Sequence, residues 1–438
     1  MCCCFFHKIL LFVAIIFISL VLKAQHRFVS QSFENINIER DIVFAIEDGF
    51  DFMGFGIDNP EPLRMDVYFP SGDNMKARPL VICLFGGAFL AGSKERPDMI
   101  AWCDSLAHYG YVAAAINYRL GFNPLTSGKG FGADEGVIRA LYRSTQDCRA
   151  AVRYFINQHE RYHIDTTCIF LLGNSAGAIT AINTAFMTGD ERSADTYETG
   201  YGANNHDLGC LDCTGGFRKN KCAVAGVVSL WGAALNPEII DKDEEIPVLF
   251  IHGTADEVVP YDKDYALNFT LGKDLNVFLY GSKSLKEHCD KLGWTHTVLD
   301  PYLGQPHCFY ACGNIIISEL NYDTFPCEYW WPVFYQTIRF LGENNKYCDK
   351  KYLPSLENTI EFTINDLSEK GSFELIFKGN LLMNNRLTLY NAIGDVVLTQ
   401  VIQSDKTQFS LAGKPAGIYI VEIKNHRYSM TQKFTLKK

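Results

Sequence analysis

One pentapeptide of the sequence, Gly173-Asn174-Ser175-Ala176-Gly177, places a serine between two glycines. The apolar run 168–172 precedes it, and a helix-forming segment that ends just before Gly189 follows it. A sharp turn from strand to helix holds a serine hydroxyl above the edge of a sheet, and glycine at the flanking positions lets the strand and the helix cross closely. This context, rather than the bare Gly-x-Ser-x-Gly pattern, predicts that Ser175 is a nucleophile.

A second glycine-rich segment, 84–89 (LFGGAF), follows an apolar strand that begins at Leu80. Acyl transfer needs N–H groups that are already aimed at the developing oxyanion. We expect such an oxyanion hole to consist of the backbone N–H groups of Gly87 and Ala88, with that of Ala176 as the third donor. The alternative is an ordinary tight turn from strand to helix. The position of the loop upstream of the serine turn favours the oxyanion hole.

A serine nucleophile on such a turn needs an acid and a histidine further along the chain, in the order Ser, Asp, His. Asp256 lies in a loop directly after an apolar strand and is our candidate acid. Loop aspartates often only cap nearby backbone, so capping of Val258 is the alternative. Glu257 is the nearest competitor, and Asp241 and Asp243, which precede the strand, are weaker candidates.

The sequence holds eleven histidines, and the order of the chain leaves three of them as candidates for the base: His288, His296 and His307. His307 lies in a Gly/Pro loop after the short apolar stretch 298–302, so it can reach the serine from the end of the last strand. We therefore prefer His307 on geometric grounds. It would take the proton of Ser175, a reaction that needs neither a metal nor an organic cofactor.

The elements that must position these residues alternate between short apolar runs and longer segments of helical period. Runs rich in Val, Ile, Leu, Phe and Ala are typical of strands buried on both faces of a parallel sheet. They span residues 80–85, 111–118, 168–172, 223–231 and 248–251. The pattern predicts an α/β fold with a doubly wound, mostly parallel sheet. Residues 42–47 and 64–69 are expected to be antiparallel edge strands leading into it.

Both ends of the chain differ from this central part in their pattern of apolar and polar residues. His7 and Lys8 precede the apolar run 9–22, which has the length of a signal peptide core and is short for a membrane span. An uncleaved anchor is the alternative. Beyond the central part, short alternating segments without helical period predict a small β-sandwich. The expected division is a signal peptide at 1–24, a catalytic domain at 25–346, a linker at 347–359 and a β-sandwich at 360–438.

Removal of residues 1–24 takes three of the 15 cysteines and leaves twelve. Export to an oxidising compartment permits disulfides among them. Cys83 and Cys168 lie in apolar runs and are expected to be buried free thiols. For Cys210-x-x-Cys213 a disulfide is favoured over a zinc site, because a second CxxC is missing.

Four segments carry a family resemblance: LFGGAFLAGSK, AINYRLGF, TQDCRAAVRYFINQHERYHID and LLGNSAGAITA. They resemble the carboxylesterase and hormone-sensitive-lipase-like α/β-hydrolases over most of residues 60–340, and most closely bacterial feruloyl and acetyl carbohydrate esterases. The resemblance implies an α/β-hydrolase fold and a secreted serine carboxylic-ester hydrolase. It also implies a triad of Ser175, His307 and Asp256. The family usually has histidine where this chain has Phe85.

Residues 360–438 resemble the C-terminal sorting domain of the type IX secretion pathway. The matching parts are Tyr390-Asn391-x-x-Gly394, the segment 415–419 (PAGIY) and Lys433. The resemblance implies export through the periplasm and outer membrane by the type IX machinery, either into the surroundings or onto the cell surface. A carbohydrate-binding module is the alternative, but the segment has no tryptophan for an aromatic platform.

Composition limits the possible partners further. The net charge is −10 and no basic stripe is present, which disfavours nucleic acid. The expected partner is an ester, either a small molecule or a carbohydrate, with no membrane span in the mature form. A peptidase or lactonase using the same residues, and an inactive adhesion protein, are the alternatives. Trp231, Phe89, Phe309 and 329–331 are candidates for lining the site or for ordinary packing, and the polar insertion 190–222 is expected to shape substrate entry.

Overall fold

The computed structural model describes residues 27–50, 57–122, 133–197, 206–242, 245–266, 277–310, 329–345, 361–366, 372–378, 385–391, 396–402, 406–424 and 429–436. The chain divides into two compact units, Met1–Pro354 and Ser355–Lys438. The expected signal peptide at 1–24 and linker at 347–359 lie outside the described residues.

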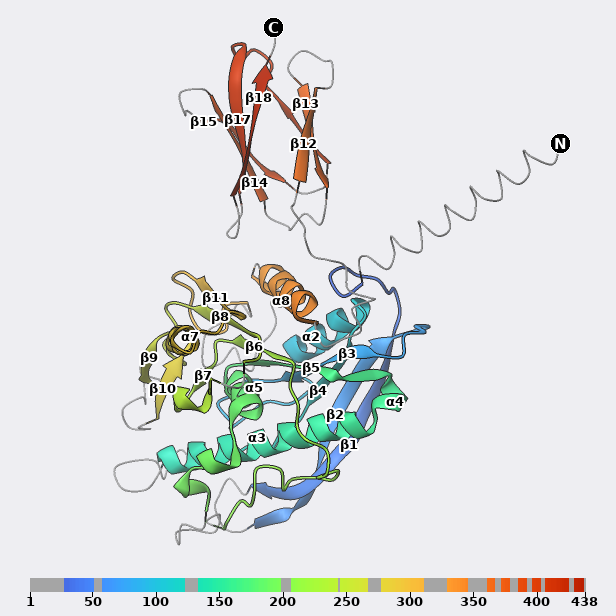
Figure 1. The fold of residues 1–438 in the computed structure, drawn as a ribbon, viewed down its shortest axis with the longest axis vertical. Coiled ribbons are helices and arrows are strands. Elements are labelled where there is room, and N and C mark those ends of the chain that lie inside the picture. The colour runs from blue at the N-terminus through green and yellow to red at the C-terminus, as the bar shows by residue number, and fades with distance from the viewer. Residues whose placement is uncertain are drawn as a thin grey trace, which may run out of the picture. The chain divides into compact units, whose positions relative to one another are not determined.

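An eight-stranded sheet forms the centre of the first unit, with the strand order β1-β2-β4-β3-β5-β6-β8-β11 (Figure 1). Its strands are β1 (Ile36–Phe50), β2 (Ile57–Pro70), β3 (Arg78–Leu84), β4 (Val112–Ile116), β5 (Ile164–Asn174), β6 (Gly226–Leu230), β8 (Val248–Gly253) and β11 (Thr297–Tyr302). The six strands from β4 to β11 are parallel, whereas β1 and β2 pair antiparallel at one edge. The predicted α/β fold with a mostly parallel sheet is confirmed.

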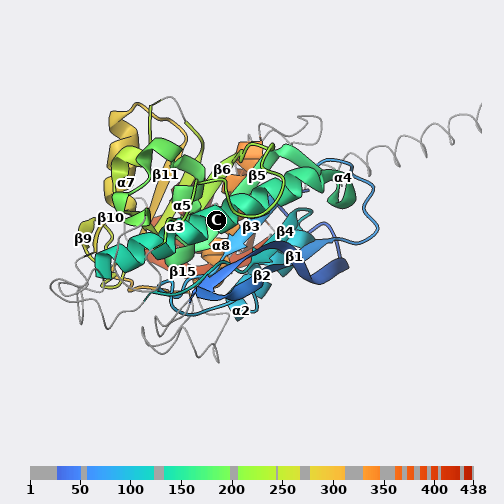
Figure 2. The same cartoon turned by 90° about the horizontal axis from the view of Figure 1, so that it is seen from below.

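Helices cover both faces of this sheet, which is why β3, β4 and β6 are buried along their whole length. The helices α3 (Ala133–Asn157) and α5 (Ala176–Phe186) lie on one face, and α2 (Pro97–His108) and α8 (Trp330–Asn344) lie on the other (Figures 1 and 2). The remaining elements of this unit are α4 (His159–Tyr162), α7 (Ser282–Lys291), η1 (Gly189–Glu191), η2 (Ala194–Thr196), η3 (Pro237–Ile239) and a small sheet of β7 (Ala233–Ala234), β10 (Phe278–Gly281) and β9 (Lys263–Tyr265). In the described part of the chain, no helix is both long and apolar enough to cross a membrane.

The second unit consists of two antiparallel sheets with the orders β12-β13-β16 and β15-β14-β17-β18. Their strands are β12 (Glu361–Asp366), β13 (Ser372–Lys378), β14 (Asn385–Asn391), β15 (Val396–Ile402), β16 (Lys406–Ser410), β17 (Gly417–Lys424) and β18 (Ser429–Leu436). Side chains of both sheets share one apolar core. For example, the rings of Phe373 in β13 and Phe434 in β18 lie 5.1 Å apart. This arrangement is the predicted β-sandwich.

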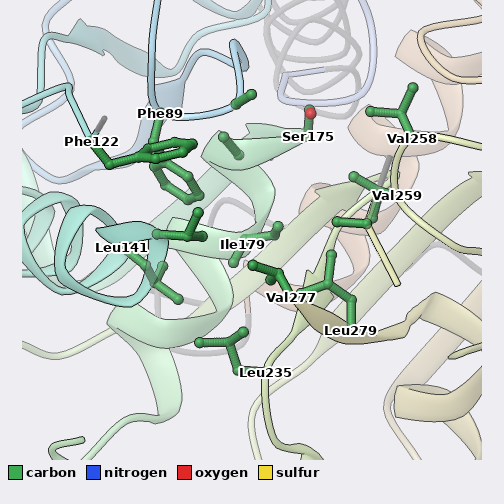
Figure 3. Close-up of a pocket in the computed structure, with 14 residues that line it drawn as sticks. Phe89, Phe122, Leu141, Ser175, Ile179, Leu235, Val258, Val259, Val277 and Leu279 are labelled. Atoms are coloured by element: carbon green, nitrogen blue, oxygen red, sulfur yellow. The ribbon is translucent and has the colours of Figure 1, made fainter. Parts of the chain in front are cut away.

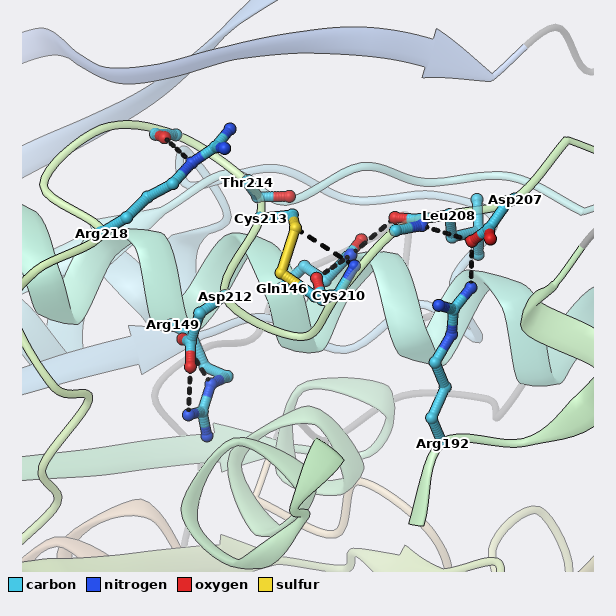
Figure 4. Close-up of a disulfide and its surroundings, with 12 residues drawn as sticks. Gln146, Arg149, Arg192, Asp207, Leu208, Cys210, Asp212, Cys213, Thr214 and Arg218 are labelled. Atoms are coloured by element: carbon cyan, nitrogen blue, oxygen red, sulfur yellow. Dashed lines mark hydrogen bonds and ion pairs between the residues drawn. A yellow bond between two sulfur atoms is a disulfide. The ribbon is translucent and has the colours of Figure 1, made fainter. Parts of the chain in front are cut away.

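The insertion 190–222 lies along one polar stripe of α3 (Figure 4). Arg139 donates to three backbone carbonyls of the insertion, and the Gln146 amide donates to two more at 2.8 Å each. Arg149 and Arg153, further along the same stripe, both bind the Asp212 carboxylate. Because neighbouring members of this set are seven, three and four residues apart, they fall on one face of the helix. The insertion is therefore held by α3 through hydrogen bonds and ion pairs.

The cysteines follow the sequence expectations with one exception. Cys210 and Cys213 form the predicted disulfide within the insertion, and Asp212 lies between them in the sequence (Figure 4). Cys83 is a buried thiol outside any disulfide, as predicted. Cys168 was expected to be free, but it is disulfide-bonded, to a partner outside the described residues. The prediction was wrong because an apolar strand position shows burial but does not show what packs against it.

Loss of the Asp212 carboxylate is expected to destabilise the first unit. Arg153 is fully buried, so Asp212→Ala would leave its guanidinium with a backbone carbonyl of the insertion as its only partner among the described residues. Asp212 is itself 40% exposed, so we expect a loss of only about 1–2 kcal/mol in the free energy of unfolding.

Urea unfolding followed by tryptophan fluorescence measures this unit alone, since all five tryptophans precede the second unit. The exposed Asp190, changed to alanine, is the control; equal midpoints for both variants would contradict the expectation.

Candidate active site

The turn between β5 and α5 carries Ser175 in a conformation that non-glycine residues rarely adopt, with φ at 52°. Two glycines make this turn possible. A Cβ on Gly173 would lie 2.2 Å from the carbonyl oxygen of Gly177, and one on Gly177 would lie 2.1 Å from that of Leu84. Strand β5, helix α5 and strand β3 therefore cross at distances that only glycine allows. The turn has the strand–turn–helix form expected for an exposed nucleophile at a sheet edge.

The structure brings the three predicted residues Ser175, His307 and Asp256 together. They lie after the carboxyl ends of β5, β11 and β8, which share one edge of the parallel sheet. His307 Nε2 lies 3.0 Å from Ser175 Oγ, and His307 Nδ1 lies 2.7 Å from Asp256 Oδ2. Both distances are those of hydrogen bonds. The arrangement can transfer a proton from the serine hydroxyl to the imidazole while the carboxylate holds the ring.

Asp256 caps the backbone N–H of Val258, which was the alternative role expected from the sequence, and it also contacts His307. Its Oδ1 accepts hydrogen bonds from the N–H groups of Val258 and Val259, each at 2.9 Å. Its Oδ2 faces His307 and, at 3.2 Å, a second histidine, His252. Burial alone would raise the pKa of Asp256, but the two histidines lower it well below its usual value. The carboxylate is therefore ionised and fixed in place.

Opposing effects act on the pKa of His307. The ring is fully buried, which lowers its pKa, but the adjacent negative charge of Asp256 outweighs burial and raises it well above its usual value. A histidine acts as a base only when it is neutral. Activity that depends on His307 should therefore rise with pH through a midpoint above the ordinary histidine range, which is centred near about 6.5.

Exchange of Asp256 for asparagine is expected to shift this midpoint. The variant removes the charge that raises the pKa of His307 and leaves the burial that lowers it, so the acid limb of kcat/KM should move to lower pH. The rate should also fall, by about 10⁴-fold, because asparagine no longer stabilises the required tautomer. Glu257→Gln, at the exposed neighbouring position, is the control and should change neither quantity. An acid limb that stays in place in Asp256→Asn would contradict this account.

The glycine-rich loop after β3 faces Ser175. Gly87 has φ at 136° and Ala88 at 53°, and a Cβ on Gly87 would lie 1.9 Å from the carbonyl oxygen of Ala91. In the described part of the chain, no backbone carbonyl accepts from the N–H of Gly87 or Ala88. Ala176 is the first residue of α5, where helix N–H groups lack intrahelical partners. These three N–H groups are the ones predicted to bind an oxyanion.

Sequence reasoning missed a buried polar network behind this loop. Arg96 donates to the carbonyl oxygen of Gly86 at 3.2 Å and contacts Asp98 at 3.4 Å. Asp98 in turn accepts from the side-chain amide of Asn174 at 2.6 Å, next to the nucleophile. Asp98 is fully buried and Tyr310 also donates to it. The network ties the glycine-rich loop to the serine turn, and no spacing in the sequence indicates it.

Phe85, which occupies the place of the family's histidine, supports the loop through its ring. It stacks on Tyr118 with ring centroids 4.3 Å apart and an interplanar angle of 13°. The Tyr118 hydroxyl donates to the carbonyl oxygen of Phe85 at 2.6 Å. The loop is thus fixed by stacking and one short hydrogen bond to its backbone.

A cavity opens beside Ser175 between α3, α5 and the small sheet (Figure 3). Its described lining consists of Ser175 and thirteen apolar residues: Ala88, Phe89, Phe122, Val137, Leu141, Ala176, Ile179, Leu235, Val258, Val259, Ala266, Val277 and Leu279. No described residue of the insertion 190–222 is among them. The expectation that the insertion shapes substrate entry therefore finds no support in the described residues, because they lie on the polar stripe of α3.

Of the candidate aromatic residues, only Phe89 lines this cavity. Trp231 is fully buried and packs against the rings of His307 and Phe309. Trp330 is buried against Trp102, with ring centroids 4.7 Å apart. These residues support the loop of the histidine and the second face of the sheet, so packing is their described role.

The competing histidines and carboxylates lie elsewhere. His288 is on α7, where its Nε2 lies 3.0 Å from the carbonyl oxygen of Ile240. His296 is half exposed and pairs with Glu245 at 2.8 Å. Asp241 and Glu257 are exposed, and Asp243 lies outside the described residues. None of the described competitors contacts Ser175.

Two known families match parts of this chain. Residues 65–234 match the family described as BD-FAE, an esterase-like domain. This match, together with the sheet topology, supports an α/β-hydrolase esterase. Residues 369–437 match the secretion system C-terminal sorting domain, so the esterase is exported by the type IX route to the cell surface or beyond. The enzyme is a carboxylic ester hydrolase, and the type IX machinery is its partner in export.

Solved structures similar to the esterase include two bacterial enzymes. Esterase 2 of Thermogutta terrifontis, phosphoramylated by tabun, is 16% identical; the match covers 71% of this chain and 95% of that chain, with a TM-score of 0.42. A truncated carbohydrate esterase from gut microbiota is 17% identical, with coverage of 70% and 96% and a TM-score of 0.44. None of the curated proteins matches the sequence significantly.

Proposed function

We propose that the esterase hydrolyses its substrates through a covalent acyl-enzyme formed on Ser175. The observation that carries this proposal is the pair of hydrogen bonds that joins Ser175 Oγ to His307 Nε2 and His307 Nδ1 to Asp256 Oδ2. A serine hydroxyl is a weak nucleophile until a base removes its proton, and this chain supplies an oriented base.

The reaction proceeds in two halves. His307 takes the proton of Ser175 as Oγ attacks the ester carbonyl, and the N–H groups of Gly87, Ala88 and Ala176 bind the resulting oxyanion. His307 then protonates the leaving alcohol, which breaks the ester bond and leaves the acyl group on Oγ. Water, deprotonated by His307, attacks the acyl-enzyme, and the proton returns to Ser175 as the acid leaves. Asp256 stabilises the imidazolium in both halves.

Acetyl and feruloyl esters of polysaccharide are the substrates that the family resemblance suggests, and we propose them as the first screen. The full exported chain is incubated with 4-nitrophenyl acetate, acetylated xylan and methyl ferulate, and product release is measured. Turnover of any of these esters supports the proposal. Absence of all turnover in a folded protein would contradict it and would favour an adhesion role, whereas amide cleavage exceeding ester cleavage would favour a peptidase.

A further inference from the structure

The cavity beside Ser175 has a chemical character that restricts the substrate. Ser175 is the only polar residue among the 14 described residues that line it. The empty space in the cavity and in front of its mouth, open solvent included, amounts to about 610 Å³. A ligand group that enters it finds no side chain of the described lining, apart from the nucleophile itself, with which to form a hydrogen bond. Apolar surface is therefore favoured there, and a polar substituent would lose its water without compensation.

The residues that line the cavity indicate whether it binds the acyl group or the alcohol of an ester. The leaving alcohol must receive its proton from His307 Nε2, so it lies on the side of the histidine. His307 does not line the cavity. Ala88 and Ala176, whose N–H groups are proposed to bind the oxyanion, do line it. The cavity therefore extends from the carbonyl carbon in the direction of the acyl group.

The depth of the cavity sets the length of that group. Ile179, on α5, lines the cavity about one helical turn beyond Ser175, and one turn rises by about 5.4 Å. Leu235 lines the cavity further still from the serine (Figure 3). Carbon–carbon bonds of about 1.5 Å advance an extended alkyl chain by a little over 1 Å each, so one turn corresponds to about four methylene groups. An acetyl group would leave this space unfilled.

We infer that the acyl pocket is built for an apolar acyl group of about six carbons, in preference to acetyl and to hydroxylated aromatic acyl groups such as feruloyl. This inference rests on the proposed ester hydrolysis at Ser175 and specifies its substrate class. Each buried methylene contributes about a fourfold gain in binding, so the preference accumulates along the chain. The phenolic hydroxyl of a feruloyl group would find no partner in the described lining.

A series of 4-nitrophenyl esters tests the inference on the full chain. Hexanoate has four more methylenes than acetate, so its kcat/KM should exceed that of the acetate by up to about 250-fold. It should also exceed kcat/KM for 4-nitrophenyl ferulate. An acetate or a ferulate turned over as well as the hexanoate would overturn the inference while the proposed function stands. Absence of turnover for every ester, without labelling by a fluorophosphonate, would instead overturn the proposed function.

A pocket-filling variant distinguishes the cavity from a general preference for apolar esters. Leu235→Trp should lower the ratio of hexanoate to acetate turnover by about 10-fold or more, because the indole occupies the far end of the pocket. Ile46→Trp, at a position 63% exposed on β1, is the control and should leave the ratio unchanged. The ratio does not depend on how much enzyme is active, and Val277→Phe provides a second filling variant. Unchanged ratios in both filling variants would overturn the inference.

Discussion

Replacement of Ser175 or of His307 by alanine is expected to lower kcat for short-chain nitrophenyl esters by about 10⁶-fold. Each variant removes one end of the hydrogen bond between Oγ and Nε2, which is 3.0 Å long. Without the imidazole the hydroxyl stays protonated, and without the hydroxyl no acyl-enzyme forms. Because the residues act as one unit, the double variant should lose no more than either single variant.

Steady-state kinetics with each purified variant measure this effect. Ser284→Ala on α7 controls for the loss of a serine hydroxyl and should keep full activity, since the Ser284 hydroxyl donates to Asp262 and has no described contact with Ser175. Retained activity in His307→Ala would show that another group activates the nucleophile. A double variant that loses far more than each single variant would contradict the joint action of the two residues.

The second large effect is expected at Gly87. A Cβ there would lie 1.9 Å from the carbonyl oxygen of Ala91, so Gly87→Ala must displace the glycine-rich loop and its N–H groups. Loss of an oxyanion donor costs about 10²- to 10³-fold in kcat, and displacement of the loop affects the donors of both Gly87 and Ala88. We therefore expect a loss of at least about 10³-fold.

Gly72→Ala is the matched control for this variant. Gly72 also has a positive φ, at 68°, but nothing lies within 4 Å of an added Cβ. It therefore carries the backbone strain of an alanine with positive φ without moving the catalytic loop. Kinetics and tryptophan fluorescence separate loss of activity from unfolding. Activity in Gly87→Ala within a few fold of Gly72→Ala would contradict an oxyanion role for this loop.

The residues that the sequence could identify are those whose role is encoded locally. The turn at Ser175 is recognisable because glycines, a preceding apolar run and a following helix occur within a few residues of one another. His307 and Asp256 could be chosen because the order of the chain and a loop after a strand restrict the candidates. The loop context of each of these side chains lies within about ten residues of it, and only the order of the chain adds information from further away.

Other features depend on segments that meet only in the folded chain. Arg96 and Asp98 flank a proline at the start of a helix, a pattern typical of an exposed helix end. Yet both are buried, Asp98 against the nucleophile turn and Arg96 against the glycine-rich loop. His252 looks like the end of a strand, but it contacts the Asp256 carboxylate. The partner of Cys168 and the course of the insertion along α3 are likewise set by tertiary packing. Helical or strand period shows which face is apolar and does not show what covers it.

A fluorophosphonate probe tests the central claim, that Ser175 is an activated nucleophile, most directly. The full chain is labelled, digested and analysed by mass spectrometry, beside Ser175→Ala and His307→Ala. We predict one adduct per chain, on the peptide that contains Ser175, no adduct in Ser175→Ala and a strongly slowed reaction in His307→Ala. An adduct on another residue, or a folded wild-type chain that does not react, would contradict the account.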